Sequence, residues 1–160
     1  MNIAIVCHER NLLKDVAYKV ALALGMFFVD ASDFIEYDLV DKERATNFCS
    51  KDYLEVREKK AIENICSYEN TLISITDELF VSSQNFENVR KQRAIFFLKT
   101  DKKFSLKAEK IVSKLGEEAR ENEIANISDF VILQDKKTNE VLCKEIVGKM
   151  NEYKGVRNDK

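Results

Sequence analysis

Short apolar runs alternate along the chain with longer segments whose apolar residues recur every three or four positions. The apolar runs are nearly continuous, which is typical of strands buried on both faces of a parallel sheet. They predict strands at residues 2–7, 27–29, 71–75, 94–98 and 129–133. The segments with helical spacing predict helices over residues 12–24, 52–66, 103–120 and 138–153. Strands that alternate with helices predict right-handed βαβ units and a sheet covered by helices.

The first predicted helix shows how the pattern assigns a buried face. Leu13, Val16, Val20 and Leu24 fall on one side of it, and Gly25 follows as a C-terminal cap. The length of 160 residues predicts a single domain over residues 1–153, followed by a polar tail over 154–160. Hydrophobic residues make up 45% and charged residues 34% of the chain, as in an ordinary soluble globular protein.

Charge and composition exclude several classes of partner. The formal net charge of −2 gives no electrostatic case for nucleic acid. No apolar run has membrane-spanning length, and residues 1–7 lack the basic leader of a signal peptide. We therefore expect no nucleic-acid partner, no membrane and a cytoplasmic location.

The cysteines and the sole histidine do not predict a metal site. No two cysteines form a CxxC pair, so we expect free thiols and no metal. Cys7 and His8 are adjacent at the end of a strand, where neighbouring side chains point to opposite faces, so they do not predict a nucleophile–base pair.

A candidate phosphate-binding loop follows the first strand. Strand, loop and helix, with Lys14 at the loop–helix junction, is the layout of a P-loop. Such a loop requires glycine where His8 and Leu13 stand and a hydroxyl residue where Asp15 stands. Lys14 could be a phosphate ligand or a solvated lysine in the first turn of a surface helix. Asp15 could ligate a metal, but together with Glu9 it would repel a polyphosphate.

Other segments resemble the shikimate kinase family, small P-loop phosphotransferases, over nearly the whole chain. Residues 28–36 resemble the family's Phe-x-Asp-Thr-Asp-x-x-Ile-Glu segment, and residues 96–100 resemble its fourth strand. Residues 120–129 are similar to its Arg-x-x-x-Tyr-x-x-x-Ala-Asp run. The resemblance implies a P-loop kinase-like α/β fold: a three-layer α/β/α sandwich around a five-stranded parallel sheet in the order 2-3-1-4-5.

The resemblance also implies roles for individual residues. It would make Lys14 and Asp30 catalytic, and it would bring Lys14 and Asp15 to ATP and Mg²⁺. It would make Arg57, Arg120 and Asp33 substrate-binding residues.

Asp30, Arg57 and Arg120 also have structural interpretations. Asp30 could instead cap a helix, and caps are common at such positions. Arg57 could instead pair with its charged neighbours on a helix, and Arg120 lies beside two glutamates.

The departures from the family pattern decide the functional hypothesis. Thr76-Asp77-Glu78 stands where the family has a glycine triplet, and residues 100–120 are too few to hold its mobile lid. We therefore expect a degenerate shikimate kinase homologue, a pseudokinase, with no cofactor. In this reading the former substrate cleft binds a small carboxylate or other anion, or a protein partner.

Two alternatives remain open at this stage. One is a functioning kinase of shikimate or a similar hydroxy acid, which would use ATP and Mg²⁺ with Lys14, Asp30, Arg57 and Arg120. The other is a non-catalytic structural protein that binds a partner through an exposed helix such as 138–153. The conformation of residues 7–15, an open concave loop or a collapsed turn, should discriminate between the first two readings.

Overall fold

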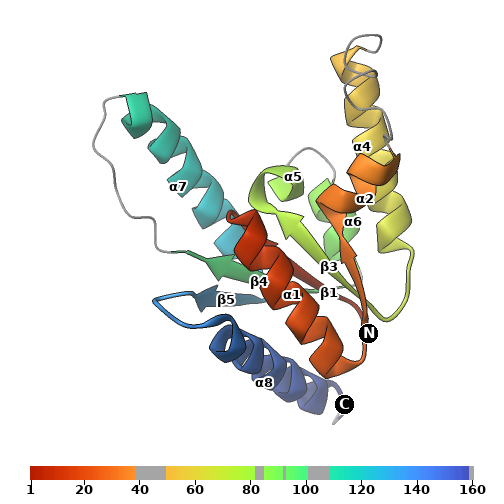
Figure 1. The fold of residues 1–160 in the computed structure, drawn as a ribbon, viewed down its shortest axis with the longest axis vertical. Helices are drawn as coiled ribbons and strands as arrows, with labels where there is room; N and C mark the ends of the chain where they lie inside the picture. The colour runs from red at the N-terminus through yellow and green to blue at the C-terminus, as the bar shows by residue number, and fades with distance from the viewer. Residues whose placement is uncertain (39–49, 82–84, 92, 101–108, 159–160) are drawn as a thin grey trace.

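The computed structural model describes residues 1–38, 50–81, 85–91, 93–100 and 109–158. Its strands are β1 (Ile3–Cys7), β2 (Phe27–Asp30), β3 (Thr71–Thr76), β4 (Ala94–Lys99) and β5 (Phe130–Leu133). Its helices are α1 (Arg10–Leu24), α2 (Ala31–Asp38), α4 (Lys51–Cys66), α5 (Asp77–Val81), α6 (Asn85–Arg90), α7 (Glu109–Ile127) and α8 (Asn139–Asn158). Figure 1 shows these elements along the chain.

The strands form one parallel five-stranded sheet in the order β2-β3-β1-β4-β5. β1 lies at the centre, between β3 and β4, and all of its residues are buried. The predicted sheet, its strand order and the central place of the first strand are thereby confirmed. Continuous apolar sequence permits this placement because both faces of a central strand are covered.

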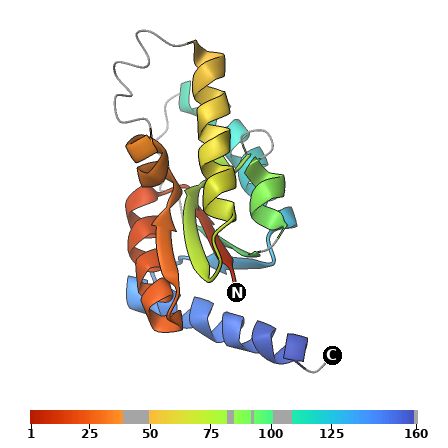
Figure 2. The same ribbon diagram turned by 90° about the vertical axis from the view of Figure 1, so that its right-hand side faces the viewer.

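Helices cover both faces of the sheet, which makes the predicted three-layer sandwich (Figures 1 and 2). α1 and α8 pack on one face with Ile3 and Ile5, and α2, α4, α5, α6 and α7 pack on the other with Ala4 and Val6. Successive side chains of β1 therefore pack in the cores on opposite faces of the sheet, because side chains alternate between the two faces along a strand.

Several boundaries differ from the sequence-based expectation. α1 begins at Arg10 rather than residue 12, and α7 runs on to Ile127 rather than ending at residue 120. α8 continues past residue 153 to Asn158. Residues 101–108 lie outside the described residues. They include the start of the helix predicted at 103–120 and part of the stretch 100–120 that we considered too short for a lid. No helix in the described segments is long and apolar enough to cross a membrane.

Candidate functional site

The connection between β1 and α1 consists of His8 and Glu9. Glu9 is the N-cap of α1, and its carboxylate accepts hydrogen bonds from the backbone N–H groups of Asn11 at 3.3 Å and Leu12 at 2.9 Å. The Glu9 carbonyl accepts the N–H of Leu13 at 3.0 Å. Because the first N–H groups of a helix have no partner within the helix, they are a natural anion site. Here a carboxylate of the chain itself occupies that position.

The backbone of this connection does not form an anion-binding concavity. Such nests use residues in the left-handed region. In the described part of the chain, positive φ angles occur at Gly25, Asn70, Asp135 and Lys136, none of which lies between β1 and Lys14. The connection is therefore a tight turn that leads directly into a helix.

The predicted position of Lys14 at the loop–helix junction is wrong. The Glu9 cap starts α1 at Arg10, so Lys14 lies inside the helix. The same turn of helix directs Leu12 and Leu13 into the core, where their side chains are 9% and 0% exposed. An open loop would bring both leucines out of the core, which is the physical reason for the earlier helix start.

Lys14 and Arg10 are both engaged by carboxylates of α2. The Lys14 ammonium group contacts the Asp33 carboxylate. Arg10 lies 2.9 Å from Asp33 Oδ1 and 3.3 Å from Glu36 Oε1. The hydrogen bond from Lys14 lowers the pKa of Asp33 and raises the pKa of Lys14. The proposed phosphate and substrate roles of Lys14 and Asp33 therefore remain predictions, and in the structure Lys14 pairs with Asp33, which also pairs with Arg10.

We expect Asp33→Asn to cost less than about 1 kcal/mol at neutral pH, since exposed ion pairs contribute little. The folded-state pKa of Asp33 is lowered, so its contribution is present above the unfolded value of about 3.9 and is lost as the pH falls through the lower folded value. Urea unfolding of wild type and variant at several pH values measures this difference. The difference should vanish in acid and shrink with salt. Glu152→Gln, on exposed α8 surface, is the control, and a difference that grew in acid would contradict the assignment.

Asp15 and Asp30 are held by local structural contacts. The Asp15 carboxylate accepts the side-chain amide of Asn139 and lies 3.6 Å from Lys19 Nζ, so it links α1 to α8. Asp30 is 6% exposed, and it accepts the N–H of Asp33 at 2.9 Å and the hydroxyl of Ser74 at 2.5 Å. The first of these bonds is a helix cap for α2, the structural interpretation offered above. Their metal-binding and catalytic roles stay predictions.

A cluster that the sequence interpretation missed lies at the carboxyl ends of β1 and β3. His8 Nδ1 is 3.1 Å from Asp77 Oδ2, and Asp77 is 1% exposed. The Asp77 carboxylate also accepts the N–H of Glu78 at 2.9 Å. Arg120 Nη1 lies 3.6 Å from Asp77 and 3.5 Å from Glu78, contacts of ion pairs rather than short hydrogen bonds. The guanidinium predicted to bind substrate therefore faces two carboxylates of the chain.

The pairing of His8 with Asp77 follows from the sheet. The register places Cys7 opposite Thr76, so the residues that follow the two strands meet at one edge. Burial raises the pKa of the Cys7 thiol to about 12, so this thiol is not a nucleophile at neutral pH. The signal in the sequence that could have found the cluster is the position of both residues close after a predicted strand, His8 directly after residues 2–7 and Asp77 two positions after residue 75.

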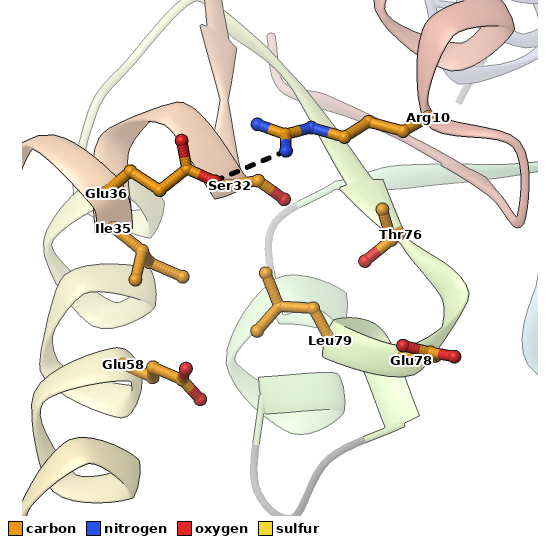
Figure 3. Close-up of a pocket in the computed structure, with 8 residues that line it drawn as sticks. All are labelled: Arg10, Ser32, Ile35, Glu36, Glu58, Thr76, Glu78 and Leu79. Atoms are coloured by element: carbon orange, nitrogen blue, oxygen red, sulfur yellow. Dashed lines mark hydrogen bonds and ion pairs between the residues drawn. The ribbon is translucent and has the colours of Figure 1, made fainter. Parts of the chain in front are cut away.

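A pocket of about 330 Å³ opens beside this cluster, between α2, α4 and the start of α5 (Figure 3). Its lining consists of Arg10, Ser32, Ile35, Glu36, Glu58, Thr76, Glu78 and Leu79. The lining thus contains three carboxylates and one guanidinium. Arg57 lies on α4 next to Glu58, but neither Arg57 nor Arg120 is among the lining residues of the described chain. Their joint recognition of a carboxylate stays a prediction.

Comparison with known proteins identifies the fold. No family model matches the chain, and no curated protein matches it in sequence. The shikimate kinase from Aquifex aeolicus is similar in structure, with a TM-score of 0.74 and 15% identity over 96% of this chain and 98% of that one.

Two further solved structures are also similar to this chain over nearly its whole length. The shikimate kinase from Acinetobacter baumannii in complex with shikimate gives a TM-score of 0.69 with 13% identity over 96% and 94% of the two chains. The dephospho-CoA kinase from Campylobacter jejuni gives 0.64 with 13% identity over 96% and 98%. These matches confirm the resemblance at the level of architecture: the chain has a shikimate-kinase-like P-loop kinase fold.

Proposed function

We propose that this protein is a degenerate shikimate kinase-like protein that does not transfer a phosphoryl group from ATP, and that its remaining activity is to bind a small molecule in the pocket between α2, α4 and α5. The observation that carries this proposal is the Glu9 carboxylate on the N-terminus of α1. A nucleotide phosphate would need the same N–H groups and would meet a negative charge there.

The groups around the turn favour the same conclusion. Phosphoryl transfer depends on cations and a metal that neutralise the transferred group. Lys14 and Arg10 already contact carboxylates of α2, and Asp15 offers no hydroxyl for Mg²⁺. Displacing Glu9 would also remove a helix cap, which costs about 1 kcal/mol.

A functioning kinase would require the first turn of α1 to unwind as far as Lys14. That movement would bring Leu12 and Leu13 out of the core, at a cost of about 1.5–3 kcal/mol for each fully exposed leucine. The alternative of a structural protein that docks through α8 is also disfavoured. Leu142, Ile146 and Met150 of α8 are already buried in the core shared with α1, so the main apolar face of this helix is in use.

The proposal predicts no saturable binding of Mg·ATP in titration calorimetry up to millimolar nucleotide. Lys14→Ala should leave this result unchanged, because Lys14 already has a carboxylate partner. Lys19→Ala, on the same helix but paired with Glu140 at 2.6 Å, is the matched control. A micromolar dissociation constant that is lost in Lys14→Ala and kept in Lys19→Ala would show that the turn opens and would refute the proposal.

A further inference from the structure

The charges that line the pocket do not cancel. Arg10 lies 3.3 Å from Glu36, and Arg120 lies 3.5 Å from Glu78, so two of the three glutamates have a cation of the chain beside them. Glu58 is partly buried, and in the part of the chain that the structure describes it has no hydrogen bond or ion pair. Among the described residues, the lining therefore holds one carboxylate without a counter-charge.

The remaining lining residues give the pocket apolar and hydroxyl groups near Glu58. Ile35 and Leu79 face each other between Glu58 and the pair formed by Arg10 and Glu36 (Figure 3). Ser32 and Thr76 add two hydroxyl groups to the wall. The volume of about 330 Å³ lies at the lower end of the range of small-molecule sites. The pocket thus offers an apolar middle, hydroxyl partners and one negative charge to a compact ligand.

A partly buried carboxylate without a partner loses hydration, and no hydrogen bond or ion pair compensates for that loss. A cation that enters the pocket would restore a charge-assisted hydrogen bond, among the stronger polar contacts in proteins. An anion would instead meet three carboxylates and one guanidinium that is already paired. The electrostatic balance of the lining therefore selects for positive charge.

We propose that the pocket binds a small monocation, a protonated amine on a compact apolar body that carries a hydroxyl group, and that Glu58 recognises the amine. This inference rests on the proposed small-molecule role of the same pocket and specifies its ligand class. It is opposite in charge to the small carboxylate expected from Arg57 and Arg120, so one experiment separates the two.

The test uses three probes of matched shape and different charge. These are 4-aminocyclohexanol, cyclohexane-1,4-diol and 4-hydroxycyclohexanecarboxylate, titrated into the full chain at neutral pH in low salt. The amine should bind most tightly, the diol more weakly, and the carboxylate not at all. In Glu58→Gln the affinity for the amine should fall at least about tenfold, the effect of losing one charge-assisted hydrogen bond.

Glu55→Gln is the matched control, because Glu55 is exposed on the same helix and outside the lining. It should bind the amine as the wild type does, and thermal unfolding should show both variants folded. Tighter binding of the carboxylate, equal binding of all three probes, no binding of any probe, or an unchanged affinity in Glu58→Gln would overturn the inference. Mg·ATP binding is measured separately. If the protein bound Mg·ATP and still preferred the amine, the proposed loss of phosphotransfer would be refuted and the proposed ligand class would not.

Discussion

Leu13→Ala is expected to destabilise the protein by about 2–5 kcal/mol, the range for removing a fully buried leucine side chain. Leu13 is 0% exposed and packs in the core that α1 shares with α8 and the sheet. The loss has two parts: the apolar surface removed from the core and the cavity left behind. Urea unfolding followed by circular dichroism measures it.

Leu13→Gly should cost about 1 kcal/mol more than Leu13→Ala, because glycine is a poor helix residue. The glycine expected in a P-loop at this position therefore cannot be introduced without a large loss of stability. Leu22→Ala on the same helix is the control, since Leu22 is 64% exposed and its truncation should matter little. A cost below about 0.5 kcal/mol for Leu13→Ala, within the range of surface changes, would show that Leu13 leaves the core and that the turn opens.

Arg93→Met is expected to cost about 3 kcal/mol, because it removes a buried guanidinium that holds three backbone carbonyls. Arg93 is 7% exposed and donates to the carbonyl of Thr71 at 3.0 Å and to those of Ile65 and Cys66 at 3.3 Å each. The last two carbonyls belong to the final turn of α4, where a cation is also favoured by the helix dipole. Burial lowers the pKa of Arg93 from its ordinary value.

Methionine keeps much of the side-chain volume, so the variant reports on the hydrogen bonds rather than on packing. Arg93→Lys should recover part of the loss, since one ammonium group cannot reach three carbonyls as a planar guanidinium does. The control is Lys91→Met, because Lys91 is exposed at the end of α6. If chemical denaturation gave the same stability for Arg93→Met and Lys91→Met, the buried contacts would have no energetic role.

The candidate site could be predicted only in part. The residues that follow β1, β2 and β3 do meet at one edge of the sheet, as parallel strands require. Which of them pair was not predictable, because Asp77 lies 69 residues from His8 and Glu58 lies on a helix from another part of the chain. The expected joint site of Arg57 and Arg120 stays a prediction, and the pocket that the structure shows is lined by three glutamates.

The sequence by itself determined the layers of the fold. Five nearly continuous apolar runs separated by helical periodicity predict a parallel sheet covered by helices, and this signal is local because side-chain spacing follows the backbone period. It also placed Val16 and Val20 of α1 in the core. Only the tertiary structure decided where α1 begins and what its first turn binds. Leu12 and Leu13 are buried in the core, and Glu9 caps the helix that contains them. Asp33 of α2 pairs with Lys14. Burial and long-range charge pairing therefore determine the conformation of this turn, which the local sequence pattern does not.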